Sequence, residues 1–192
     1  MKLPSVIKGW LNTAETPEKW LANYVATGDK KYLSRLVVQF NQSLYHYLYS
    51  LSEKETAEDA LQSTWLKVMK SSNSQNQQRH TNVKSWLYTI ARNTLVDELR
   101  RQQKWQWQEL NEQIVITKTL AENVEDDQKL AAFNIAINQL PFFQREAIIF
   151  QQEGFSVMEI CQLTEDSFET VKSRLRYARK SLKELLRAHY ER

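Results

Sequence analysis

Glycine and proline are scarce in this sequence, with three of each among 192 residues. Turns and strand ends depend on these two residues, whereas the helix-favouring Leu, Glu, Lys, Arg, Gln and Ala are common. No apolar stretch approaches the roughly 20 residues that a membrane-spanning helix requires. Residues 1–20 are interrupted by prolines and charges and lack the apolar centre of a signal peptide. We therefore expect a cytoplasmic, all-α protein without a membrane span.

Residue types that build disulfides, metal sites and active sites are also few. The single cysteine, Cys161, excludes an internal disulfide, and it falls in an apolar helical stretch where packing is its expected role. The three histidines share no ligand spacing with it, and no glycine-rich phosphate loop is present. Glu58-Asp59 and the acidic run 125–127 are better explained as a contact edge and a solvated linker than as catalytic pairs. We predict neither an enzyme nor a cofactor.

Charge is arranged in three blocks, although the net charge is only +3. Residues 79–104 carry six Lys/Arg against two Asp/Glu, and residues 168–192 carry eight against three. Residues 108–130 between them carry six acidic side chains against two basic ones. Two basic segments around an acidic one suit a protein that contacts a polyanion in two places. Solvated helix faces joined by an ordinary linker would explain the same charges.

Helical periodicity divides the chain into two small helical domains joined by a linker. Three helices are expected in the first domain: residues 30–50, a helix that opens at Thr56 with its hydroxyl as the cap, and residues 83–103. The polar stretch 71–82 is predicted to be a loop. The expected organisation is an N-terminal extension (1–25), a first domain (26–105), an acidic linker (106–127) and a second domain (128–192). The extension could pack on the first domain or bind a partner.

The second domain contains the signature of a helix-turn-helix motif. A helix over 128–140 ends before Pro141, which is expected to be the first residue of the next helix, and Gly154 suits that helix's exit. Residues 156–159 (SVME) form a capping box, and residues 166–169 (DSFE) are expected to form a second cap of the same kind. Two capped helices separated by about three residues predict a helix-turn-helix.

The last helix has the composition of a DNA-recognition helix. Its apolar side chains recur at helical spacing, from Val171 through Leu175 to Leu185. The remaining face carries polar and basic side chains that can reach base edges and phosphates: Thr170, Lys172, Ser173, Arg174, Arg176, Tyr177, Arg179 and Lys180. A surface helix with a solvated basic face is the alternative, and the two caps at this spacing favour recognition.

Both domains resemble those of bacterial sigma factors, particularly the compact extracytoplasmic-function (ECF) group. The second domain is similar to region four, in Leu140-Pro141, Gln144-Arg145-Glu146, Gly154-Phe155-Ser156, Glu159-Ile160, the run Thr170-Val171-Lys172-Ser173-Arg174-Leu175 and Ala178-Arg179. The first is similar to region two, in residues 57–62 (AEDALQ) with Trp65-Leu66, and in residues 85–93 (SWLYTIARN) with Asp97 and residues 99–101 (LRR). The chain departs from the family pattern at Ser63, where the family usually has an acidic residue, and in the turn at Glu165, where it commonly has glycine or a small apolar residue.

The resemblance implies a sigma factor that binds core RNA polymerase at its β′ clamp and directs promoter-specific initiation. The implied polymerase-binding residues are Asp59, Gln62, Ser63, Trp65 and Leu66. The implied residues for recognition and melting of the minus-ten element are Lys84, Ser85, Trp86, Tyr88, Thr89, Arg92, Asn93, Asp97, Arg100 and Arg101. The basic face of the last helix would read the minus-thirty-five element, with Arg174, Arg179 and Lys180 on phosphates. The acidic linker would thread through a polymerase channel or simply be flexible. The family also implies an anti-sigma factor as a partner, and we expect a monomer when no partner is bound.

Two other functional classes compete with this interpretation. A helix-turn-helix regulator would bind its site without polymerase, but it has no need of the basic, aromatic helix 83–103. A helical interaction protein, such as an antagonist that sequesters a sigma factor, leaves both basic clusters unexplained. Trp86 is equally well interpreted as a core residue or as a base-stacking wedge.

Overall fold

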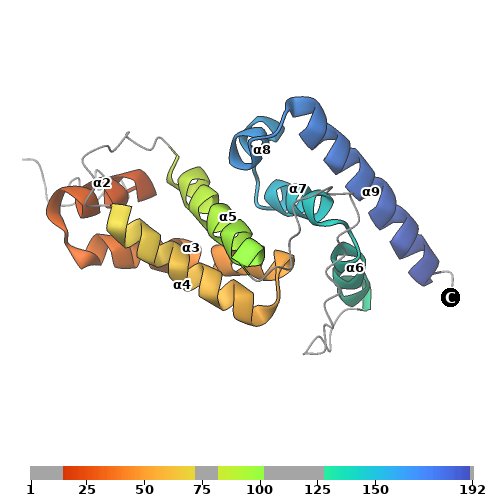
Figure 1. The fold of residues 1–192 in the computed structure, drawn as a ribbon, viewed down its shortest axis with the longest axis horizontal. Coiled ribbons are helices and arrows are strands. Elements are labelled where there is room, and N and C mark those ends of the chain that lie inside the picture. Colours follow the sequence, from red (N-terminus) through yellow and green to blue (C-terminus); the bar gives the residue numbers. More distant parts are fainter. Residues whose placement is uncertain (1–14, 72–81, 102–127, 191–192) are drawn as a thin grey trace, which may run out of the picture.

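The computed structural model describes residues 15–71, 82–101 and 128–190, and all regular secondary structure within these ranges is α-helical (Figure 1). The predicted acidic linker and most of the predicted polar loop lie outside the described residues. No described helix is long and apolar enough to cross a membrane. The helices are α2 (Pro17–Thr27), α3 (Lys30–Leu51), α4 (Lys54–Ser71), α5 (Val83–Arg101), α6 (Gln128–Asn138), α7 (Phe142–Gln152), α8 (Val157–Thr164) and α9 (Phe168–Tyr190).

Helices α2 to α5 form the first half of the molecule. On α3, Leu36, Phe40, Leu44 and Leu48 recur every four residues and are buried, so one stripe of this helix faces the core. Helix α4 packs on both α3 and α5. The predicted helix 30–50 is confirmed to within one residue at each end, and the predicted helix 83–103 is confirmed as far as Arg101, where the described residues end.

The part of the N-terminal extension that is described packs on the first domain. Leu21 and Tyr24 are buried where α2 lies against α3. Glu18 also accepts a hydrogen bond from the backbone N–H of Val83 at 3.3 Å, so α2 caps the start of α5. Of the two roles left open for the extension, packing is the one that residues 17–27 take.

Helices α6 to α9 form the second half around Leu140, Phe150, Ile160 and Leu175. Arg145 is fully buried here, and its guanidinium donates to the carbonyl oxygens of Leu140 (3.1 Å) and of Ser50 in the first half (3.3 Å). Burial lowers the pKa of Arg145 to about 10. This charged side chain is therefore a structural link between the two halves.

Two predicted helix starts are wrong by one or two residues. Helix α4 begins at Lys54, because the N–H of Ala57 already bonds to the carbonyl of Glu53 at 2.9 Å. Thr56 is buried inside the helix and cannot be its cap. Pro141 is the N-cap of α7 and not its first residue, and α6 ends at Asn138. Local sequence signals located each helix but did not determine the residue at which it starts.

The two halves pack directly on each other. In Figure 1, α5 lies at the centre of the molecule with α7 and α8 beside it. Contacts join α3 to α7 and α5 to α8. The boundary is filled by aromatic rings: Tyr47 stacks on Phe150 with centroids 4.9 Å apart, and Tyr88 meets Phe155 edge-on at 5.0 Å.

Candidate nucleic-acid interface

The first helix of the helix-turn-helix is held by the predicted capping box. The N–H of Glu159 donates to the Ser156 hydroxyl at 3.3 Å, and the Glu159 carboxylate accepts from the N–H of Ser156 at 2.8 Å. The hydrogen bonds from the backbone and side chain of Ser156 lower the pKa of Glu159 below its ordinary value. The helix then ends at Glu165, whose φ of 59° and ψ of 28° are left-handed. This backbone explains why the family commonly has glycine in the turn.

The second cap is formed by a different residue from the one predicted. The N–H of Thr170 donates to the hydroxyl of Ser167 at 3.1 Å. The carboxylate of Asp166, the first residue of the predicted cap, accepts hydrogen bonds from the guanidinium of Arg174. The cap is thus shifted by one residue, and the expected role of Asp166 is wrong. Its ion pair with Arg174 instead joins the connection between α8 and α9 to the second helical turn of α9.

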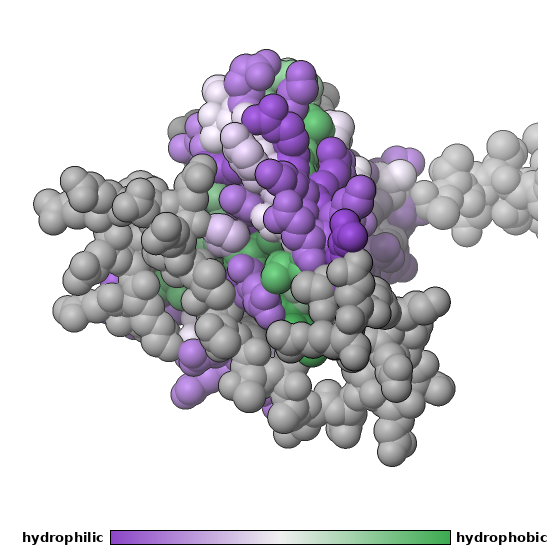
Figure 2. Space-filling view, turned by 90° about the vertical axis from the view of Figure 1, so that its right-hand side faces the viewer, coloured by the Kyte–Doolittle hydropathy of each residue, from purple (hydrophilic) through white to green (hydrophobic). Residues whose placement is uncertain are grey.

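Helix α9 presents its basic face to solvent. Val171, Leu175 and Ala178 are buried against α7 and α8, so the opposite side of the helix is free. Figure 2, which looks onto this end of the molecule, shows a continuous band of hydrophilic side chains there. The exposed members of the predicted recognition set are Lys172, Arg176, Tyr177, Arg179 and Lys180, and Thr170 and Ser173 are partly exposed. Arg174 differs from them, because it lies over the ring of Phe143 at 4.4 Å while paired with Asp166.

Three residues of the predicted minus-ten set lie on the face of α5 that meets α7. Lys84, Tyr88 and Arg92 are spaced four residues apart and so project from one side of the helix. Arg92 forms an ion pair with Glu146, with its Nε 2.9 Å from the carboxylate oxygen. The Tyr88 hydroxyl donates to the Glu153 carboxylate at 2.6 Å, and the Lys84 amine lies 3.7 Å from the same group. These three side chains are engaged by the second half of the protein.

Burial shapes the acid–base properties of this contact. Burial acts to lower the pKa of Arg92, but the neighbouring Glu146 carboxylate outweighs it, and the pKa is raised. Tyr47 of α3 donates to the same carboxylate at 3.1 Å, and burial, reinforced by the charge of Glu146, raises its pKa well above the ordinary value. The pKa of Tyr88 is raised by burial and by its bond to Glu153. All three groups therefore keep their protons at neutral pH.

The rest of the predicted minus-ten set is distributed around α5. Asn93, Asp97, Arg100 and Arg101 are exposed, and Asp97 lies 3.8 Å from Lys67 of α4. The hydroxyl of Thr89 donates to the carbonyl of Ser85, and the N–H of Ser85 to the Asn82 side chain. Trp86 is half-buried and packs against the hydrophobic core, which supports its core role without testing the stacking role.

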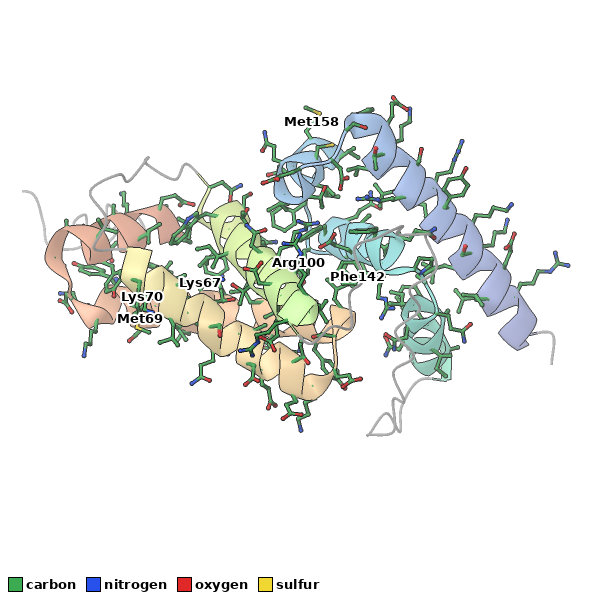
Figure 3. The ribbon with its side chains drawn as sticks, viewed as in Figure 1. Lys67, Met69, Lys70, Arg100, Phe142 and Met158 are labelled. Atoms are coloured by element: carbon green, nitrogen blue, oxygen red, sulfur yellow. The ribbon has the colours of Figure 1, made fainter. Side chains whose placement is uncertain are left out.

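The predicted docking residues form an exposed face on α4. Asp59, Gln62 and Leu66 are exposed, and 46% of the Leu66 surface is accessible. Ser63 is half-buried. Trp65, also half-buried, donates from its indole N–H to the Asn41 side chain at 2.9 Å, which fixes the ring. Figure 3 shows Lys67, Met69 and Lys70 at the end of α4 that points away from α6 to α9.

Glu146 and Glu153 are the site residues that sequence reasoning missed. Both contact α5, and Glu146 is almost fully buried. For Glu146, the available signal was a glutamate directly before the apolar run 147–150 (AIIF) of one helix, since a buried carboxylate must have a partner. Nothing in the local sequence indicated that this partner is Arg92.

Comparison with known proteins places both halves in one family. The family model for sigma-70 region 2 matches residues 36–105, which include all of α4 and α5. The ECF RNA polymerase sigma factor SigM of Mycobacterium tuberculosis is 30% identical over 169 residues, covering 86% of this chain and 82% of that protein. The chain belongs to the ECF sigma factors. ECF sigma factors are non-catalytic subunits that direct transcription initiation, and a regulator acting apart from polymerase is not favoured.

Other relatives span nearly the whole of this ECF sigma factor. SigE of Mycolicibacterium smegmatis is 29% identical over 189 residues, covering 94% of this chain and 72% of that protein. Among solved structures, the sigma factor RpoE in complex with the anti-sigma factor NepR from Bartonella quintana aligns with a TM-score of 0.67 and 28% identity. That alignment covers 83% of this chain and 98% of RpoE. CnrH, solved with the cytosolic domain of CnrY, shares the fold with a TM-score of 0.63 at 21% identity, over 90% of this chain and 99% of CnrH.

Proposed function

We propose that this sigma factor uses three separate faces in promoter recognition, acting in the cytoplasm. The α4 face with Asp59, Gln62 and Leu66 docks on the β′ clamp of core RNA polymerase. The basic, aromatic side of α5 captures the minus-ten element as it opens, and α9 reads the minus-thirty-five element. The first two tasks belong to residues 26–105 and the third to residues 128–192, joined by the acidic linker 106–127.

The exposed basic face of α9 is the observation that carries the proposal. Lys172, Arg176, Tyr177 and Lys180 lie on the side of the helix opposite the buried Val171 and Leu175. This is the geometry that lets a helix enter the major groove while its apolar side stays anchored. Lys172 and Arg176 can donate to guanine edges, and Lys180 can hold a phosphate.

The docking face on α4 supports the polymerase part of the proposal. Leu66 is a large apolar residue exposed between charged and polar neighbours, and such residues are frequent at the centres of protein interfaces. The indole of Trp65 donates to Asn41, so this ring is already oriented before docking. Ser63 stands where the family usually has an acidic residue, so this face has one negative charge fewer than the family pattern. We expect Asp59 to supply the acidic contact.

Variants on the α4 and α9 faces test the proposal, because one should lose core binding and the other should lose only transcription. Leu66→Asp should abolish binding to purified core polymerase, whereas Arg176→Ala with Tyr177→Ala should leave core binding intact and abolish transcription that depends on the minus-thirty-five element. Lys183→Ala, an exposed substitution farther along α9, is the matched control. Core binding that survives Leu66→Asp, or an equal loss of core binding in all variants, would refute the assignment of faces.

An anti-sigma factor is the partner we propose for the inactive form. The structure of RpoE contains the anti-sigma factor NepR, and that sigma factor aligns with most of this chain. A protein antagonist of this kind would cover faces of both halves. When no partner is bound, we expect the sigma factor to be a monomer.

A further inference from the structure

The boundary between the two halves places α7 on the side of α5 that the proposed function assigns to DNA. Lys84, Tyr88 and Arg92, one turn apart on α5, each contact the segment 146–155. Glu146 is almost fully buried against Arg92, whose side chain is itself only 13% exposed. In this arrangement nucleic acid cannot reach the ring of Tyr88 or most of the Arg92 side chain, whereas Lys84 stays 36% exposed beside Glu153.

The groups that α7 offers to α5 have the chemistry of a single DNA strand. The carboxylates of Glu146 and Glu153 take the place of phosphates on Arg92 and Lys84. The rings of Phe150 and Phe155 lie tilted and edge-on to Tyr88, with centroids 6.2 and 5.0 Å away, and fill the space beside that ring that a base would need for stacking. Anions alternating with flat apolar rings are what a single-strand-binding surface recognises.

We propose that residues 146–155 are an intramolecular mimic of single-stranded DNA that closes this protein over its own minus-ten surface. The inference rests on the proposed role of α5 in binding the minus-ten strand. It adds that residues 146–155 compete with that strand for the same face of α5. Strand capture and closure are mutually exclusive, because both use Lys84, Tyr88 and Arg92. The exposed face of α9 stays available in the closed form, so the second half can meet duplex DNA before the first half opens.

Opening the contact would break buried hydrogen bonds and expose aromatic rings. Opening would leave the Arg92 charge and the hydroxyls of Tyr47 and Tyr88 without their present partners. It would also uncover four rings, Tyr47, Tyr88, Phe150 and Phe155, that are at most 5% exposed. A bound strand restores both kinds of interaction, whereas water restores only the hydrogen bonds.

Removing the two mimicking charges provides the test. Glu146→Gln with Glu153→Gln should bind a fluorescent, mixed-sequence 12-nucleotide single strand at least about tenfold more tightly than the wild type at low salt, because the competent form becomes dominant. Glu55→Gln with Glu184→Gln is the control, since it removes two exposed carboxylates, one from each half, and changes net charge equally. An equal gain in the control, or no gain in the interface variant, would overturn the proposal.

A second measurement uses the wild-type protein and so does not depend on a variant folding correctly. A zero-length carbodiimide cross-link should join Lys84 to Glu153, whose charged atoms are 3.7 Å apart, and mass spectrometry should detect the linked peptides. Saturating single-stranded DNA should abolish this cross-link and leave the Lys31–Asp29 cross-link (2.9 Å) unchanged. A Lys84–Glu153 yield that DNA does not alter would contradict competition at this face.

The proposed function has its own separate test. Adding Arg92→Ala to the double glutamine variant should reverse the gain in strand binding, because position 92 then carries no cation to bind a phosphate. If the gain persists, α5 is not the strand-binding surface and the proposed role of α5 fails. If strand binding depends on Arg92 but the double glutamine variant shows no gain, the role of α5 stands. Only the proposal that residues 146–155 mimic a DNA strand is then wrong.

Discussion

Glu165 is a single residue at which the structure explains a departure from the family pattern. It is the only non-glycine residue with positive φ among the described residues. Its N–H bonds to the carbonyl of Cys161, which ends α8 in a left-handed cap. A residue with a Cβ in this conformation costs about 1 kcal/mol, which glycine avoids.

Glu165→Gly is expected to stabilise the protein by roughly 0.5–1 kcal/mol, the relief of strain less the added entropy of the unfolded chain. The measurement is urea unfolding followed by circular dichroism. Glu165→Ala, which keeps the Cβ, should show no such gain. Equal stability of the glycine and alanine variants would mean that the turn carries no strain.

Residue-scale prediction from sequence was accurate for caps that rest on short local spacing and inaccurate where a distant residue takes part. The Ser156–Glu159 capping box is confirmed because both partners lie within one turn. Asp166 was predicted to be a cap, but Arg174, two turns along α9, binds its carboxylate. The contact of Tyr88 with DNA stays a prediction, but its hydrogen bond to Glu153, 65 positions away, was not foreseen.

At the scale of the element, the capping box should make the stability of α8 depend on acid. The pKa of Glu159 is lowered in the folded protein, so its contribution is present above the ordinary carboxyl pKa and is lost as the pH falls through the lowered value. Glu159→Ala should therefore cost up to about 1 kcal/mol at pH 7 and less at pH 3, because the cost falls as the carboxylate takes up a proton. Urea unfolding of both proteins at the two pH values checks this, and an undiminished difference at pH 3 would contradict it.

Helix positions were largely predictable because burial follows the 3.6-residue period. Starts and ends were less so, as α4 and α7 show, since a helix can add a residue wherever a backbone carbonyl is free. The sequence left the role of α2 open between packing on the first domain and binding a partner. The contact of α2 with α5 depends on Glu18 meeting Val83, and no periodicity links these two residues.

At the scale of the whole molecule, the packing of the two halves should weaken at alkaline pH. Burial and the charge of Glu146 raise the pKa of Tyr47, against the opposing effect of the Arg92 charge, and burial with the hydrogen bond to Glu153 raises the pKa of Tyr88. Both phenols are protonated in the closed form, so closure is fully stable below the ordinary tyrosine pKa of about 10 and loses stability above it.

Solution scattering at pH 8 and pH 11 measures this opening as an increase in the radius of gyration. Tyr47→Phe removes one of the two titrating hydroxyls and should reduce the increase, whereas Tyr32→Phe, on α3 but outside this interface, should leave it unchanged. A radius that does not change with pH in the wild type would show that the two phenols do not control the packing.

The arrangement of the two halves was beyond the reach of the sequence. Composition and spacing predicted two helical domains and the order of their faces, but contact between domains depends on pairs such as Arg92–Glu146 and Arg145–Ser50, which lie 54 and 95 residues apart. Neither pair belongs to a local motif. The sequence therefore predicts the surfaces, and the structure shows which of them are covered.

Transcription from a promoter library by purified core RNA polymerase, with and without this protein, tests the central claim most directly. The account predicts specific start sites that appear only when the protein is added, and alignment of those starts should reveal two conserved promoter elements. Absence of any selected site, together with retention of a preferred duplex by the protein alone in a gel shift, would contradict it and identify a regulator that acts without docking on polymerase.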